Sequence, residues 1–167
     1  MSTINGISLT EDETAYVTMI SNAINSNSTF IIEYVTGEFT SSEGANAFAA
    51  YMNKELGNNS GDKMLTPDGR LSSGWISNHG NGLNVPTLYG SHSFVIDNLS
   101  ENERSVTSGH ELLGHGFSAA KGITGDENHS NAIRTDNLIR RLLNLPQRDG
   151  HDHNGTVTKP YNMPLVK

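Results

Sequence analysis

The chain has 167 residues, which suits a single domain spanning residues 1–167 with its own hydrophobic core. Hydrophobic residues make up 34% of the chain and 17 residues are glycine, which indicates a loop-rich globular protein rather than a helical bundle. The 18 acidic and 11 basic residues give a formal net charge of −7, so the composition speaks against nucleic acid as a partner.

The chain contains no cysteine, which excludes disulfides and thiolate metal ligands. No stretch approaches the ~18 apolar residues of a membrane span. We therefore expect a soluble protein or a soluble module released from a larger secreted one. The sequence does not indicate an oligomeric state.

The first third of the chain predicts two helices and a strand. Thr10 followed by Glu13 is a capping box and predicts a helix over about residues 11–25. Residues 30–35 are rich in β-branched and aromatic side chains and predict a strand at the centre of a sheet. Small and apolar residues at helical spacing predict a second helix over residues 42–56. The residues expected on its buried face are Ala45, Phe48, Ala49 and Met52.

A loop and a further strand are expected next. Residues 57–74 are polar and glycine-rich, and predict a long surface loop or a loose hairpin. Residues 93–96 predict a strand directly before the following helix. Such a strand can be the sheet edge onto which an extended peptide adds, or an ordinary edge, and the sequence leaves both interpretations open.

Two more helices are expected in the second half of the chain. Ser100 and Glu103 form another capping box and predict a helix that ends at residues 121–122. A last helix is expected over about residues 129–144, and an irregular tail with one short strand over residues 147–167. The residues expected to face inward from the last helix are Ala132, Ile139, Leu142 and Leu143.

The most informative stretch is Gly-His-Glu-Leu-Leu-Gly-His-Gly, at residues 109–116. On a regular helix, His110 and His115 would point in directions about 140° apart and could not share one metal ion. A π-bulge fits one more residue into a turn and would bring the two rings together. The spacing therefore predicts a distorted turn near Gly114.

The hexapeptide H-E-L-L-G-H resembles the zinc motif H-E-x-x-G-H of the dipeptidyl peptidase III family. The resemblance implies that His110 and His115 bind zinc and that Glu111 activates water. A glutamate from a second motif, E-E-x-x-A-E, is the third ligand in that family. Residues 128–133 keep the alanine of this motif, and the position of the ligand glutamate falls on His129.

A catalytic zinc usually has three protein ligands and one position open to water. The candidates for the third ligand are Asp126, Glu127 and His129. His129 is favoured because it lies on the helical face that is expected to pack inward, and Glu127 remains the alternative. Asp136, two turns further along the same face, is a candidate to orient a ligating imidazole.

Several other polar and aromatic residues have a weaker claim to the site. Arg134 and Asn137 are expected on a solvated face of the last helix. A donor for the oxyanion is also needed. Its candidates are Tyr161, His151, His153 and His92. Trp75 and Tyr89 are expected in the core rather than at the substrate.

Together these elements predict an α+β fold of the zincin-like type. A small, twisted, mostly antiparallel sheet would pack against helices, with the metal between the motif helix and the last helix. The run Ala132-Ile133-Arg134, with Asn137, is also similar to the compact metallopeptidase modules of repeat-containing secreted toxins.

The expected function is that of a zinc metallopeptidase, a hydrolase that acts on a peptide or protein substrate. Glu111 would take a proton from zinc-bound water and pass it to the leaving amine. Three alternatives stay open. The histidines can form a structural zinc site in a non-catalytic domain, the substrate can be a non-peptide amide, or the histidines can be a polar pair on a surface helix.

Overall fold

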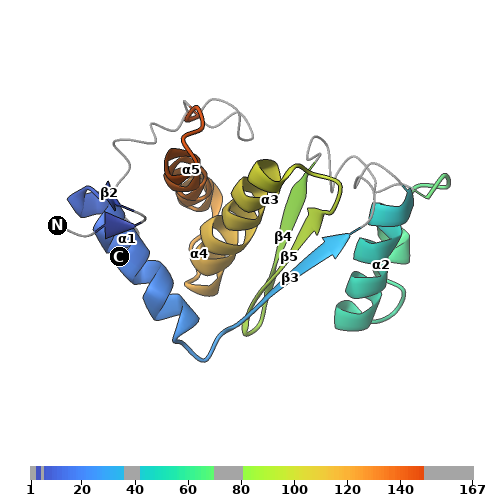
Figure 1. Cartoon of the computed structure of the whole chain (residues 1–167). Coiled ribbons are helices and arrows are strands. Elements are labelled where there is room, and N and C mark those ends of the chain that lie inside the picture. Colours follow the sequence, from blue (N-terminus) through green and yellow to red (C-terminus); the bar gives the residue numbers. More distant parts are fainter. Residues whose placement is uncertain (1–2, 5, 36–41, 70–80, 149–167) are drawn as a thin grey trace.

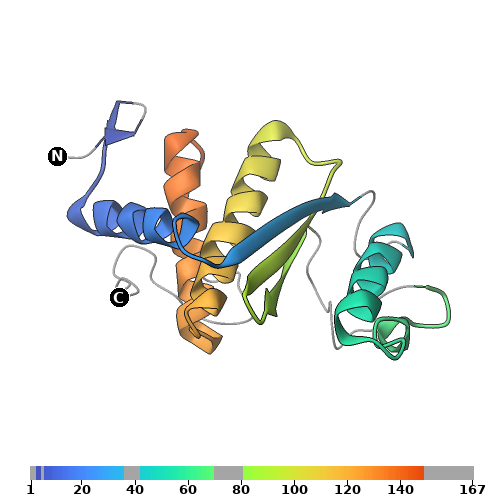
Figure 2. The same ribbon diagram turned by 90° about the horizontal axis from the view of Figure 1, so that it is seen from below.

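The computed structural model describes residues 3–4, 6–35, 42–69 and 81–148, and these form an α+β fold. A three-stranded sheet lies between one helix on one face and a layer of helices on the other (Figure 1). The view at right angles shows the same order, with the first two helices at opposite ends of the molecule (Figure 2).

The sheet is mixed, and its strand order is β3-β5-β4. The strands are β3 (Thr29–Val35), β4 (Gly82–Thr87) and β5 (Gly90–Ile96). Strand β3 pairs parallel with β5, and β4 pairs antiparallel with β5. The expectation of a mostly antiparallel sheet was therefore only half right. The expectation that residues 30–35 lie centrally was wrong, because among the described strands β3 lies at the edge of the sheet and β5 at its centre.

Strand β4 was not predicted from the sequence. Asn84 and Pro86 break the apolar pattern of this segment, and proline is confined to edge positions in sheets. A separate antiparallel ribbon is formed by β1 (Thr3–Ile4) and β2 (Ile7–Ser8) near the start of the chain.

The helices largely confirm the predicted boundaries. They are α1 (Glu11–Ile24), α2 (Ser42–Leu56), α3 (Glu101–Ser108), η2 (Gly109–Gly116), α4 (Phe117–Ala120) and α5 (Gly125–Leu142), with a short 3-10 turn, η1 (Asp62–Met64). The capping boxes of Thr10 and Ser100 are both formed. Helix α5 begins at Gly125, earlier than expected. Thr124 is its N-cap and is followed by Glu127 three residues later, but the Thr124 side chain makes no cap hydrogen bond. None of the described helices is long and apolar enough to cross a membrane.

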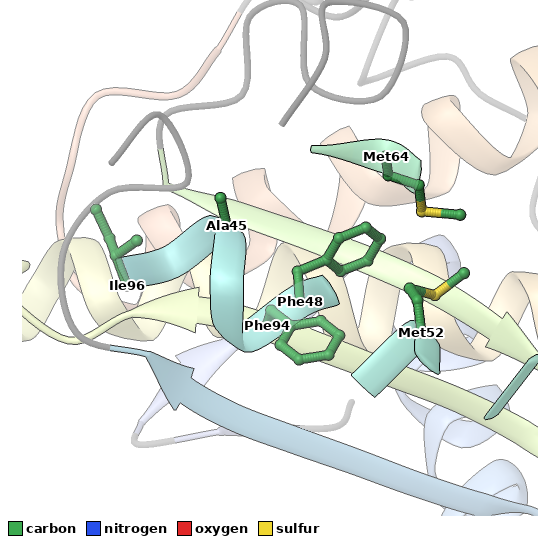
Figure 3. Close-up of a cluster of buried hydrophobic side chains, with 6 residues drawn as sticks. All are labelled: Ala45, Phe48, Met52, Met64, Phe94 and Ile96. Atoms are coloured by element: carbon green, nitrogen blue, oxygen red, sulfur yellow. The ribbon is translucent and has the colours of Figure 1, made fainter. Parts of the chain in front are cut away.

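One cluster of the hydrophobic core lies between α2 and the sheet (Figure 3), and a second joins α1 to α5. The buried side chains of the first cluster are Ala45, Phe48, Met52, Met64, Phe94 and Ile96. The rings of Phe48 and Phe94 meet edge to face with their centroids 5.7 Å apart. The predicted buried face of α2 is therefore confirmed.

Helix α1 packs against α5 on the side away from the sheet. The hydroxyl of Tyr16 contacts Oγ1 of Thr135 and lies 3.3 Å from the carbonyl oxygen of Asn131. Burial raises the pKa of Tyr16 to about 12, so this hydroxyl stays protonated. Arg141 of α5 pairs with Glu13 of α1 at the same interface. The layer order is thus α2, sheet, the α3-η2-α4 rod, α5 and α1.

Candidate metal centre

The motif residues form a π-helix, η2, between α3 and α4. The backbone N–H of Phe117 donates to the carbonyl of Leu112, five residues back, which is the bond that defines this helix type. The distorted turn that the spacing predicted is confirmed. Five-residue spacing now brings His110 and His115 to the same side, with ring centroids 4.9 Å apart and planes at 80°.

Gly114 lets α5 pack directly against this turn. A Cβ atom at this position would lie 2.5 Å from Cα of Ala132 and 3.1 Å from its Cβ. Any larger residue would push the two helices apart, since the nearer atom belongs to the backbone. The close packing brings His129 of α5 beside His115, with ring centroids 5.5 Å apart and planes at 88°.

A cleft of about 800 Å³ opens above the motif. Its lining comes mainly from η2, from strand β4 and from α5. His110, Glu111, His115 and His129 all line it. Asp126 and Glu127 are exposed on the first turn of α5 and do not line the cleft. Of the candidates for a third ligand, the structure thus brings only His129 to the other two histidines.

Side chains of α5 orient two of the imidazoles. Nδ1 of His110 lies 3.5 Å from Oδ2 of Asp136, and Nδ1 of His115 contacts Oδ1 of Asn128. An oxygen acceptor at Nδ1 favours the tautomer whose Nε2 is available to a metal. Both rings are therefore held in a form suited to coordination.

Asn128 was missed in the sequence because it fell in a segment expected to be a connecting loop. Its Nδ2 donates to the carbonyls of His115 at 3.2 Å and Ile123 at 3.0 Å. These bonds fix the amide, so that its Oδ1 faces the imidazole. Two signals in the sequence could have found it: Thr124 and Glu127 have the spacing of a helix start, and Asn128 directly precedes His129.

Asp136 is buried among three basic groups. Its carboxylate contacts Nε of Arg140 at 2.7 Å and Nη1 of Arg148 at 2.9 Å, in addition to His110. Burial by itself would raise the pKa of Asp136, but the hydrogen bonds from His110, Arg148 and Arg140 outweigh it and lower the pKa to about 2. Asp136 is therefore an anion at every pH near neutrality.

Glu111 has the opposite electrostatic character. Burial raises the pKa of Glu111 to about 7, and the charge of Asp136 raises it while His110 lowers it. A Cβ at Gly82 would lie 2.7 Å from both Cγ and Oε1 of Glu111, so glycine allows the backbone of β4 to lie against this carboxyl group. A carboxyl group with this pKa can accept and return a proton near neutral pH.

Arg134 and Asn137 do not lie on a solvated face, and that expectation was wrong. They are only 9% and 6% exposed. The Asn137 amide exchanges hydrogen bonds of 2.9 and 2.7 Å with the backbone of Arg148, so the chain after α5 folds back over this side of the helix. Nη1 of Arg134 reaches Oδ1 of Asn131 at 3.5 Å.

The oxyanion donor is not found among the described candidates. His92 lies on the α2 side of the sheet, where Nε2 contacts Glu33 at 3.1 Å and the ring stacks on Phe94. Tyr89 is 72% exposed in a turn, so its expected place in the core was wrong. The other residues named for these roles fall outside the described part of the chain: Trp75, His151, His153 and Tyr161.

The spacing of the rings fits a tetrahedral ion. Two imidazoles that share one zinc at ~2.0–2.1 Å per bond hold their ring centroids about 5 Å apart. The observed separations from His115 are 4.9 Å to His110 and 5.5 Å to His129. Within the described residues, no three acidic or histidine side chains are already arranged as a complete metal site. A three-histidine metal site would therefore require a side-chain movement, such as rotation of one imidazole ring.

Comparisons with protein-family models, with curated proteins and with solved structures found no match to this chain. The function of this chain is therefore inferred from the chemistry of the site.

Proposed function

We propose that this chain is a zinc-dependent peptidase, with His110, His115 and His129 as zinc ligands and Glu111 as general base. The observation that carries the proposal is the π-helical turn of η2, which places two imidazoles side by side next to a buried carboxyl group. Such turns are rare and occur mostly at functional sites. Their presence at a His-Glu motif supports a catalytic role.

Three histidine ligands would leave one position open, as in catalytic zinc sites, whereas structural sites are closed by four protein ligands. The cleft above His110 and His115 supports the open form, because it gives a substrate access to the imidazoles. When bound there, zinc would act as a Lewis acid toward a carbonyl group and would acidify a water molecule.

Glu111 would move the proton that hydrolysis requires. Its pKa of about 7, raised by burial, allows the carboxylate to accept a proton from water and the acid to donate it to the leaving amine. Asp136 and Asn128 would contribute by holding the imidazoles of His110 and His115 in place.

Strand β4 would hold the substrate. It is an edge strand of the described sheet and lines the cleft, so an extended peptide could pair with its backbone. The strand for which the sequence left this role open, β5, is central and already paired on both sides. Gly82 supports the assignment to β4, because it brings the strand's backbone against Glu111.

The decisive test is the Glu111→Gln variant, assayed for zinc by elemental analysis and for cleavage of a peptide library. We expect zinc to be retained and cleavage to fall by at least ~10²-fold, the usual contribution of a general base. Glu127→Gln is the matched control, because Glu127 is exposed outside the cleft and should change neither quantity.

The metal ligands are tested separately. His110→Ala and His129→Ala are each expected to lose zinc, and a chelator is expected to abolish cleavage until zinc is restored. Wild-type cleavage by zinc-loaded Glu111→Gln would refute the mechanism. Zinc retained by both histidine variants would refute the site.

A further inference from the structure

The hydroxyl group of Tyr16 lies where α1, η2 and α5 meet. Tyr16 belongs to α1 and is only 3% exposed. Its hydroxyl oxygen lies 3.4 Å from the carbonyl oxygen of Leu113 in η2 and 3.3 Å from that of Asn131 in α5. It also contacts Oγ1 of Thr135, one turn further along α5. One hydroxyl group therefore reaches both elements that carry the proposed metal ligands.

This hydroxyl group is a hydrogen-bond donor. Burial raises the pKa of Tyr16 to about 12, although a hydrogen bond with Thr135 and the charge of Arg134 lower it, so the phenol keeps its proton near neutral pH. The Thr135 hydroxyl donates to the carbonyl of Asn131 at 2.9 Å, so its oxygen accepts from Tyr16. A buried acceptor that loses its donor carries a desolvation cost. Removing the phenol oxygen would therefore disturb the packing at this point.

The two carbonyl groups lie beside a close approach of η2 to α5. Leu113 directly precedes Gly114, and Asn131 directly precedes Ala132. A Cβ atom at Gly114 would lie only 2.5 Å from Cα of Ala132. His129 lies two residues before Asn131, and the other two proposed ligands lie on either side of Leu113 in η2. The Tyr16 hydroxyl is therefore placed where the spacing between the two ligand-bearing elements is set.

Helix α1 is fixed against α5 at further points. Arg141 of α5 pairs with Glu13 of α1, and it donates to the carbonyl of Ser8 at 2.6 Å. The buried side chains of this interface are Leu9, Tyr16, Met19 and Leu138. A closely packed ring keeps its hydroxyl group in one place, so it can serve as a fixed point for η2 and α5.

We propose that Tyr16 is a positioning residue of the metal centre, an inference that rests on the proposed zinc peptidase function. Its hydroxyl group holds η2 and α5 at the spacing at which His129 can share one ion with His110 and His115. Tyr16 does not line the cleft, so it acts through the ligands rather than on the substrate. Helix α1 thus supports the metal centre from outside the cleft.

The test measures metal affinity rather than turnover. The metal-free full chain, as wild type and as Tyr16→Phe, is titrated with cobalt(II), whose visible absorption reports the ligands and geometry of its site. We expect the cobalt affinity of Tyr16→Phe to fall about five-fold, the equilibrium equivalent of one typical buried hydrogen bond. Urea unfolding of the same metal-free proteins measures their stability.

Two controls separate positioning from stability. Met19→Ala removes more buried volume from the same interface but keeps the hydroxyl group of Tyr16. It should lower the urea midpoint more than Tyr16→Phe does, and its cobalt affinity should stay within about two-fold of wild type. Tyr89→Phe removes the same atom from a residue that is 72% exposed, and it should change neither quantity.

Wild-type cobalt affinity in Tyr16→Phe would overturn the inference and leave the peptidase proposal standing, since the three ligands would still bind the ion. An equal or larger loss of affinity in Met19→Ala would also overturn it, because general loosening of α1 would then explain the effect. A wild-type chain that binds no cobalt would refute the proposed metal site itself, and the inference with it.

A second pair of variants applies if Tyr16→Phe does not fold. Thr135→Val removes the oxygen that accepts from Tyr16, whereas Thr135→Ser keeps it. We expect the cobalt affinity of Thr135→Val to fall about five-fold and that of Thr135→Ser to stay near wild type. Equal affinities of the two variants would overturn the inference.

Discussion

The two faces of the sheet are packed in different ways. Toward α2, the space is filled by large apolar side chains such as Phe48 and Phe94. Toward η2, β5 presents the buried Ser91 and Ser93, and a Cβ at Gly116 would lie 2.4 Å from Oγ of Ser91. The α2 face is thus filled by large apolar side chains, whereas the η2 face combines small polar side chains and close backbone contacts with apolar packing such as that of Phe30 against Phe117. Stability and site geometry should therefore be separable by mutation.

The largest effect on stability is expected from Phe48→Ala on the apolar face. Its side chain is 1% exposed, and removing a buried ring costs about 3–5 kcal/mol of the free energy of unfolding. Zinc affinity of the folded protein should not change. Urea unfolding and zinc titration measure the two quantities, with Leu56→Ala, 58% exposed on the same helix, as a control expected within about 0.5 kcal/mol of wild type. Weakened zinc binding in Phe48→Ala would show that the two faces are coupled.

Gly114→Ala should change both quantities. The new Cβ would meet Cα of Ala132 at 2.5 Å, a backbone atom that cannot move without shifting α5. We expect a loss of about 3 kcal/mol, the upper part of the usual range for overpacking, together with weaker zinc binding as His129 is displaced. Adding Ala132→Gly should recover only part of both losses, because Cα remains. Wild-type zinc affinity in Gly114→Ala would mean that His129 does not need this helix contact.

A smaller effect is expected from the pH dependence of Asp136. Its folded pKa of about 2 lies below the ordinary value of 3.8, because hydrogen bonds from His110, Arg148 and Arg140 outweigh burial. The ionised carboxylate therefore stabilises the fold above the ordinary pKa, and this contribution is lost as the pH falls through about 2. The stability difference between wild type and Asp136→Asn, measured without metal, should shrink by about 2 kcal/mol between neutral pH and the folded pKa. A difference that is constant with pH would contradict this.

The elements that the sequence predicted well are those with local signals. Thr10 and Ser100 are each followed by a glutamate three residues later, which predicts the start of a helix, and both capping boxes are formed. The π-helical turn was predicted because, on a regular helix, the spacing of His110 and His115 would not allow both rings to bind one metal ion. The capping-box spacing also occurs at the start of α5, where Glu127 follows Thr124 by three residues, but it was overlooked, so the helix was placed too late and Asn128 was assigned to a loop.

The features that were missed depend on contacts distant in sequence. Asn137 is buried because the backbone of Arg148 folds back over it. The hydrophobic periodicity of α5 does not indicate that a later segment covers this residue. Strand β4 owes its place to pairing with β5, since Asn84 and Pro86 do not form a strand pattern. The contact of Arg148 with Asp136 was missed for the same reason, because Arg148 reaches that carboxylate only through the segment that folds back over α5.

The π-helix also has a consequence for the history of the chain. Helices α3 and α4 continue on either side of η2, so the extra residue is absorbed within the rod and needs no new loop. Deleting one codon between His110 and His115 would leave the i,i+4 spacing of the common H-E-x-x-H motif on a regular helix. A lineage could therefore pass between the two motifs by a single in-frame insertion or deletion, with the helix ends and their caps unchanged.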